Sequence, residues 1–394
     1  MTRSYTSGIP SFPSELLRDE RSICPAANMK HQLISYIAPG APAMRRPADG
    51  NESFLRPEIG FTPAWYRQHL PIDFGEPFHR NPAYRRQCVV QMRAELRRRF
   101  PGTSIGGIDQ PDAPLDLLTG TFGAGLVSAI YGVPLVYAAD NWPNCAHQYL
   151  SDEHVATLRP PDLDHNEAFQ NLLGQVDWIA AQEGQVHGFI NWQGLLNNAQ
   201  RLRGETLFAD LLERPELCHR LFECLCVTMI EGIRKLHERQ RHSGVDLQFV
   251  TVSNCLVNLI SPKTYRELLF PFDQRLAQVY GMIGIHNCAW NATHYMKAYV
   301  EIPGVAYLDM GIGSDLLQAR SLFPKTRRAV MYTPMDLANK SSLGLEADLQ
   351  RIGRECGPAD VVCADIEAGT PDTRVLELVA LCRLISTRSR SAAG

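Results

Sequence analysis

The chain has 394 residues, of which 45 % are hydrophobic and 21 % are charged, as in globular proteins and unlike disordered chains, collagens or coiled coils. The formal net charge of −3 argues against a protein that binds nucleic acid through a general basic surface. No apolar run is long enough for a membrane-spanning helix. The amino-terminus lacks an apolar signal region, and the eleven cysteines fit reduced thiols, so we expect a cytoplasmic protein.

Residues 1–55 predict an N-terminal arm, because prolines recur along this stretch with glycine and serine between them. Such an arm is typical of a packing or subunit-contact segment, which makes a homodimer one expectation. We expect residues 56–394 to form a single domain. The first regular element predicted within it is a helix that begins near Pro82, in a position where a first helical turn tolerates proline, and continues through YRRQCVVQMRAELRRRF.

Beyond this helix, short β-branched or apolar runs alternate with amphipathic stretches that predict helices. Strand followed by helix, repeated, favours an α/β fold with a parallel sheet, and eight such units predict a (β/α)8 barrel of the TIM type. Two long stretches, 142–185 and 192–245, are then helical insertions. An open doubly wound sheet is the alternative, although no G-x-G-x-x-G follows the first strand. The expected strands are Ser104–Asp109, Leu135–Ala139, Val186–Asn191, Leu247–Ser253, Met282–Asn287, Val305–Asp309, Ala329–Thr333 and Asp360–Asp365.

Polar, aromatic and metal-binding side chains gather where these strands end, which is where a barrel enzyme carries its active site. We expect Trp142, Asn191 and Trp192 to line the mouth of the barrel and to contact a bound cofactor. Core packing would account for the two tryptophans equally well. The other candidates at strand ends are Asn254, Cys255, His286, Cys288, Asp309, Cys363 and Glu367.

His286 and Cys288 are the most informative pair, because residues two apart in a strand point to the same face. Imidazole and thiolate are both good ligands for Zn²⁺, and a catalytic zinc needs three protein ligands and one open position. The spacing alone favours a hydrogen-bonded histidine beside a buried cysteine. Cys363 favours a metal site, since a third soft ligand would face the same mouth. Cys255 is the alternative third ligand, and Glu367 either completes the site or acts as a base.

Four stretches, in order over residues 200 to 385, resemble the uroporphyrinogen decarboxylase superfamily, and most closely its zinc-dependent methyltransferase-like members that act with corrinoids. They are LRGETLFADLLERPELCHRLFE, LISPKTYRELLFPFDQRL, IGIHNCAWNATHYM and ADIEAGTPDTRVLELV. Residues 105–200, with FGAGLVSAIYGVPLVYAADNWP, resemble those members more loosely. The resemblance implies a (β/α)8 barrel.

Two branches of this superfamily differ in how they bind their substrates. Decarboxylases carry an arginine-rich segment that binds the carboxylates of the porphyrinogen, whereas LRPEIGFTPAWYRQHL here keeps only Arg56 and Arg67. Methyltransferase members bind zinc through a His-x-Cys pair and a later cysteine. By resemblance, these ligands are His286, Cys288 and Cys363, although Cys363 stands about one residue away from the family's position.

The resemblance implies that zinc holds a thiol substrate as its thiolate, which attacks a methyl group carried on a corrinoid such as methylcobalamin. Asp309, Asn254 and Glu367 would orient the substrate or the ligands. A separate corrinoid protein is then the expected partner, with no role for nucleic acid or a membrane. Two alternatives stay open: a decarboxylase or lyase acting on a cyclic carboxylate, and a protein that uses this fold in another role.

Overall fold

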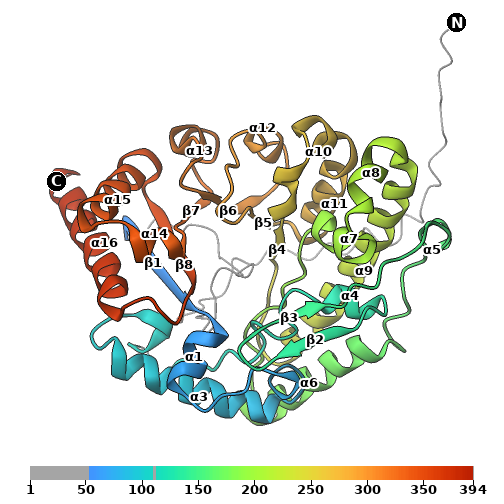
Figure 1. Ribbon diagram of the computed structural model, residues 1–394, viewed down its shortest axis with the longest axis horizontal. Coiled ribbons are helices and arrows are strands. Elements are labelled where there is room, and N and C mark those ends of the chain that lie inside the picture. Colours follow the sequence, from blue (N-terminus) through green and yellow to red (C-terminus); the bar gives the residue numbers. More distant parts are fainter. Residues whose placement is uncertain (1–52, 110–111, 394) are drawn as a thin grey trace, which may run out of the picture. The chain divides into compact units, whose positions relative to one another are not determined.

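Six parallel strands form the main sheet of the computed structural model, in the order β1-β8-β7-β6-β5-β4, and helices lie outside them (Figure 1). The structure describes residues 53–109 and 112–393, all within the compact unit Leu33–Gly394. The strands are β1 (Leu55–Phe61), β4 (Val250–Ser253), β5 (Ile283–His286), β6 (Val305–Gly311), β7 (Arg327–Met331) and β8 (Ala359–Ile366). The expected parallel α/β sheet is therefore confirmed, and five of its strands were predicted.

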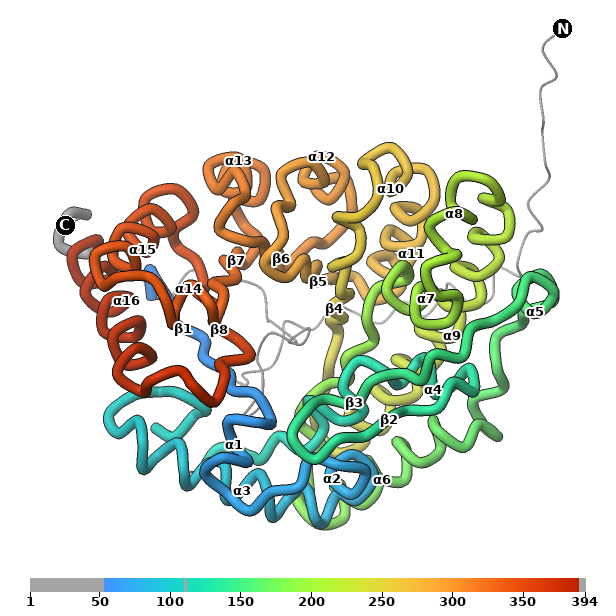
Figure 2. The backbone as a smooth tube through the Cα atoms, viewed as in Figure 1, coloured from blue at the N-terminus to red at the C-terminus, as the bar shows by residue number. Residues whose placement is uncertain are grey.

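Strand β1 was not predicted, because Arg56, Pro57 and Glu58 interrupt its apolar pattern. It pairs with β8 from the Leu55–Ala359 pair onwards, so the first described strand lies beside the last (Figure 2). The predicted boundary of the N-terminal arm at residue 55 coincides with the start of β1. Residues 1–52 lie outside the described part of the chain, so the arm remains a prediction.

The arc between β1 and β4 is irregular, and none of the three strands expected there joins the main sheet. Ser104–Asp109 contains a 3₁₀ turn, η2 (Ile105–Gly107), instead of a strand. Leu135–Ala138 is strand β2, but it pairs antiparallel with β3 (Asn141–Cys145) outside the main sheet. Val186–Asn191 contains no strand and makes one parallel bridge, between His187 and Asp116. Among the described residues, no further strand pairs between β4 and β1 to close the sheet into a barrel. The eight-stranded barrel therefore stays a prediction.

The helices surround the sheet, and the helix expected from Pro82 is confirmed as α3 (Pro82–Arg99), whose first amides are capped by Asn81. None of the helices in residues 53–109 and 112–393 combines the length and the apolar character that crossing a membrane requires. The other helices are α1 (Pro63–His69), α2 (Glu76–Arg80), α4 (Leu126–Ile130), α5 (Asp152–Thr157), α6 (Glu167–Glu183), α7 (Leu195–Arg203), α8 (Thr206–Glu213), α9 (Pro215–His242), η3 (Cys255–Leu259), α10 (Pro262–Leu268), α11 (Phe270–Tyr280), α12 (Met296–Tyr299), α13 (Leu316–Leu322), α14 (Pro334–Asn339), α15 (Ser342–Cys356) and α16 (Asp372–Ala393).

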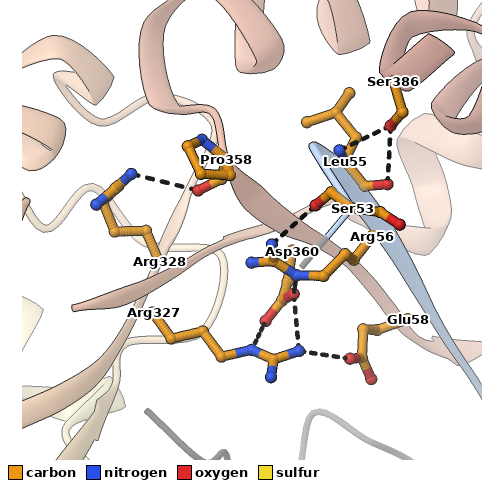
Figure 3. Close-up of polar contacts among 9 residues, drawn as sticks. All are labelled: Ser53, Leu55, Arg56, Glu58, Arg327, Arg328, Pro358, Asp360 and Ser386. Atoms are coloured by element: carbon orange, nitrogen blue, oxygen red, sulfur yellow. Dashed lines mark hydrogen bonds and ion pairs between the residues drawn. The ribbon is translucent and has the colours of Figure 1, made fainter. Parts of the chain in front are cut away.

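Ion pairs connect the starts of the strands at the amino-terminal end of the sheet. Asp360, which is 0 % exposed, accepts from the guanidinium groups of Arg56 and Arg327, and Arg327 also reaches Glu58 (Figure 3). Buried charges need such partners, because an unpaired charge in the interior is strongly destabilising. This end of the sheet is therefore structural, which leaves the carboxyl ends of the strands for a functional site.

Candidate metal centre

Three ligand atoms meet at the carboxyl ends of β4 and β5. The Sγ of Cys255, a ring nitrogen of His286 and the Sγ of Cys288 all lie within 4.8 Å of one another, and they form the one group of this kind among the described residues. The two sulfurs are 2.8 Å apart, and the Cys288 sulfur is 3.0 Å from His286 Nε2. Both cysteines are free thiols, so all three side chains are available to a cation.

Neighbouring strand ends bring these ligands together. Ser253 stands beside His286 in the parallel register of β4 and β5, and the backbone N–H of Asn254 donates to the carbonyl of His286 at 2.7 Å. The next residue, Cys255, opens the 3₁₀ turn η3. Cys288 has a φ of 56°, a left-handed conformation that non-glycine residues rarely adopt and that often marks functional sites.

The carboxylate of Asp309 fixes the orientation of the His286 ring. Its Oδ2 lies 2.6 Å from His286 Nδ1, and it also accepts from Tyr307 Oη at 3.0 Å. The Asn287 backbone N–H donates to the other oxygen at 2.7 Å. With Nδ1 bonded to the carboxylate, Nε2 is the nitrogen that points to Cys288. A carboxylate behind a histidine ligand is the usual support for a metal-binding imidazole.

The protonation states of the three ligands depend on one another. Burial lowers the pKa of His286, but the Asp309 carboxylate and the two sulfurs outweigh that effect and raise the pKa well above its usual value. The hydrogen bond between the sulfurs lowers the pKa of Cys255 well below its usual range. The same hydrogen bond raises the pKa of Cys288. Cys255 is therefore the more acidic of the two cysteines, and a metal ion would replace the protons of the ligands.

A cavity of about 410 Å³ opens directly onto the three ligands, all of which line it. Its wall also includes Trp142, Asn191 and Arg201. Several lining residues come from β3 and α7, which belong to the irregular arc between β1 and β4. The donor set therefore faces a space that can admit a small molecule, which is the arrangement of a catalytic metal site and not of a closed structural one.

Cys363, which was expected as the third ligand, does not join this group. It lies on β8 and is 0 % exposed in the hydrophobic core, whereas the next residue, Ala364, lines the cavity. Successive side chains of a strand point to opposite faces, so a shift of one residue turns a side chain away. The displacement noted in the sequence is thus a change of face, and the third potential ligand beside His286 and Cys288 is Cys255.

The structure separates the remaining candidates into two sets. Trp142 and Asn191 line the cavity, and their contact with a cofactor stays a prediction. Trp192 is buried in the core and closely approaches Gly232. Asn254 is buried behind the ligands, where its side-chain amide donates to Asp273 at 2.8 Å. Glu367 is exposed beyond the end of β8 and belongs neither to the ligand group nor to the cavity wall.

Sequence reasoning missed two charged residues of the cavity wall. Arg201 projects from α7, and Asp365 follows Ala364 on β8. Asp365 has a φ of 56°, and burial raises its pKa, an effect that the neighbouring Trp142 side chain partly offsets. Asp365 stands in the sequence at a polar strand end without a ligand motif, and no motif surrounds Arg201. Arg201 lies on a helix that follows an irregular segment, so neither a strand end nor a motif in the sequence marks it as a cavity residue.

Comparison with known proteins gives a relationship in fold. No family model and no curated protein matches the sequence. Among solved structures, a methyltransferase from Methanosarcina mazei is similar to this chain, with a TM-score of 0.58 at 14 % sequence identity. The match covers 86 % of this chain and 94 % of the methyltransferase. The chain therefore has a methyltransferase-like fold.

Proposed function

We propose that this protein is a zinc-dependent methyltransferase of the uroporphyrinogen decarboxylase superfamily, which transfers a methyl group from a corrinoid to a thiol. The observation that carries the proposal is the group Cys255, His286 and Cys288 at the cavity. Two thiolates and an imidazole are soft ligands that suit zinc better than magnesium or calcium. The similar solved structure is itself named a methyltransferase, which supports the same class of reaction.

The residues present fit a catalytic zinc site and its reaction. A Zn²⁺ ion bound there would hold a thiol substrate as its nucleophilic thiolate at neutral pH. Asp309 keeps the His286 ring in the orientation and tautomer that leave Nε2 free to bind the metal. The substrate sulfur then forms a bond to the methyl carbon while the bond from that carbon to its donor breaks, and the electron pair of the broken bond stays with the donor.

The size of the cavity favours a small methyl acceptor bound inside it and a methyl donor that approaches from outside. A volume of about 410 Å³ lies near the lower end of the range for small-molecule sites. It suits a short thiol, whereas a corrinoid is much larger. We therefore propose that a partner protein presents the methyl-corrinoid at the mouth of the cavity, beside Trp142 and Asn191.

The decarboxylase alternative requires several cations that grip a polycarboxylate. Arg56 is paired with Asp360 at the amino-terminal end of the sheet, away from the cavity. Arg67 lies beside Asp140 in a separate surface depression and donates to the carbonyl of Ala139. Neither arginine lines the cavity that holds the three ligands, so these positions favour methyl transfer over decarboxylation.

Metal analysis of the purified full-length chain tests the proposal. We expect one zinc per chain, and its loss in Cys255→Ser and Cys288→Ser. Cys145→Ser is the matched control, because Cys145 lines the same cavity but lies outside the ligand group. The same proteins are then assayed for transfer of the methyl group from methylcobalamin to a thiol. A protein that turns over cyclic carboxylates equally well with and without zinc would establish the decarboxylase alternative instead.

A further inference from the structure

Cys255 and Cys288 form a pair of sulfurs in direct contact at the cavity. Their Sγ atoms are 2.8 Å apart, whereas a disulfide bond is about 2.05 Å long, so an approach of less than about 1 Å would join them. Both residues are free thiols, and among the described cysteines only these two and Cys145 are not buried. The pair therefore combines the proximity and the access that a redox-active dithiol needs.

The backbone also suits a bond between these two cysteines. Each cysteine follows by two residues a member of the Ser253–His286 pair, which lies in the parallel register of β4 and β5. Neighbouring strands lie about 4.8 Å apart, and disulfides usually join Cα atoms that are about 4.4–6.8 Å apart. The hydrogen bond from the Asn254 N–H to the carbonyl of His286 connects the two chains just before the cysteines. A disulfide there therefore requires no rearrangement of the sheet.

The cavity gives a small oxidant access to the pair. Both cysteines line a space of about 410 Å³, whereas a water molecule takes up about 30 Å³ in the liquid. Hydrogen peroxide has only two heavy atoms, so it has room beside the sulfurs. Cys145 lines the same cavity, but it lies outside the group of atoms within 4.8 Å of one another. It is therefore a thiol that meets the same oxidant without belonging to the pair.

We propose that Cys255 and Cys288 form a reversible disulfide when a hydroperoxide enters the cavity, and that this bond excludes the metal. One sulfur attacks a peroxide oxygen, the O–O bond breaks, and water leaves with the proton of that thiol. The second sulfur attacks the resulting sulfenic acid, the S–O bond breaks, and a second water leaves with the second proton. The two sulfurs together lose two electrons, and hydrogen peroxide is reduced to two water molecules.

Metal binding and disulfide formation exclude each other because they use the same sulfurs. The thiolate is the form of cysteine that binds a metal, and a disulfide contains no thiolate. Oxidation would therefore remove two potential ligands at once and leave His286 alone, which is too few for a catalytic zinc with three protein ligands. The pair is thus a modification site that switches the centre between a metal-binding form and an oxidised form. The inference goes beyond the proposed function, because the disulfide forms without any methyl transfer.

Peptide mapping of the purified full-length chain tests the bond. The protein is treated with a chelator, oxidised with an equimolar amount of hydrogen peroxide, alkylated and digested with trypsin. We expect the peptides 242–263 and 276–297, each of which carries a single cysteine, to be joined until a reductant is added. Cys255→Ser and Cys288→Ser should form no such link, whereas Cys145→Ser should form it as the wild type does. Unlinked peptides, or a link that involves Cys145, would overturn the proposal.

Competition with zinc tests the exclusion. We expect zinc added before the peroxide to slow formation of the disulfide at least about 10-fold. The oxidised chain should bind zinc at least about 10-fold more weakly than the reduced chain, and dithiothreitol should restore the binding. Equal zinc binding by the reduced and the oxidised chain would contradict the exclusion. If the chain transfers no methyl group but forms the disulfide and loses zinc with it, the proposed function fails and this inference stands. Methyl transfer by a chain that forms no disulfide has the opposite meaning.

Discussion

Two parts of the chain contribute to the wall of the same cavity by different means. From β4 to β8, parallel strands pair in regular register, and backbone hydrogen bonds position the ligands at their ends. Between β1 and β4, the described residues add no strand to the main sheet, and pairing there consists of the separate β2–β3 hairpin and the Asp116–His187 bridge. Buried side chains satisfy the backbone there instead. Arg85 binds the carbonyls of Leu117 and Phe78.

The same principle recurs along the irregular arc. The amide of Gln240 donates to the carbonyls of Val186 and Gly188, and the carboxylate of Asp116 accepts from two successive loop amides. A strand ladder distributes its stability over many weak bonds, whereas such a loop depends on a few buried polar groups. The part of the wall between β1 and β4, the irregular wall, should therefore lose stability when a single buried polar side chain is replaced. The part built by β4 to β8, the regular wall, should lose its function mainly when the ligands or their direct partners are replaced.

The strongest test of this contrast is Arg85→Met. Arg85 is 0 % exposed, and its third hydrogen bond goes to Gln175 Oε1 at 2.7 Å. Its removal leaves three buried acceptors without their donor, which we expect to lower the free energy of unfolding by about 3 kcal/mol. Urea denaturation measures the change. Arg86→Met, on the exposed face of the same helix, where Arg86 pairs with Glu183, should cost about 0.5 kcal/mol or less. Similar losses in the two variants would contradict the contrast.

On the regular wall, Asp309→Asn should lower zinc affinity by about 10- to 100-fold. The new amide can still accept from the Asn287 N–H, but its NH2 group would face His286 Nδ1. The imidazole would then carry its proton on Nε2, the nitrogen that the metal requires. Competition with a chromophoric chelator measures the affinity. Tyr307→Phe removes one hydrogen bond to the same carboxylate and should change the affinity by about 3-fold or less. Equal affinities in all three proteins would remove Asp309 from the site.

The sequence predicts the regular wall well because its signals are local. The strands from β4 to β8 are apolar runs followed by polar residues, so the strand end carrying His286 and Cys288 could be recognised from the pattern alone. Strand β1 could not, because its charged residues are satisfied by distant partners such as Asp360. The strands expected at Ser104–Asp109 and Val186–Asn191 have the apolar pattern, but a 3₁₀ turn forms in the first segment, and the buried Gln240 side chain binds backbone carbonyls of the second.

The third ligand shows a further limit of sequence reasoning. A cysteine on a strand can face the cavity or the helices, and the choice depends on the phase of the strand. The phase of β8 is set by its register with β1, a contact between the two ends of the described chain. Cys255 leaves β4 in a 3₁₀ turn whose direction depends on the hydrogen bond from Asn254 to the neighbouring strand.

The irregular wall should also be sensitive to acid. Burial lowers the pKa of His79 to about 3, while its Nδ1 accepts from the backbone N–H of Phe122 at 3.1 Å. The unfolded chain binds the proton more readily, so stability is complete above pH 6.5 and falls as the pH decreases towards 3. Between pH 7 and pH 5 the loss from this residue is about 2 kcal/mol. Urea denaturation at both pH values should show this loss in the wild type and not in His79→Gln. The same pH dependence in both proteins would exclude His79 as the cause.

The smallest expected effect belongs to Cys363→Ala, and it tests the phase of β8. Because the thiol packs in the core and not in the cavity, its removal should lower the free energy of unfolding by about 1 kcal/mol, as the loss of one buried atom does. Zinc content should equal that of the wild type. A zinc-free Cys363→Ala protein would require β8 to turn by one residue, so that Ala364 enters the core and the register with β1 shifts. The ion pair between Arg56 and Asp360 would then break as well. A stable, zinc-loaded variant therefore establishes both the strand phase and the exclusion of Cys363 from the ligand set.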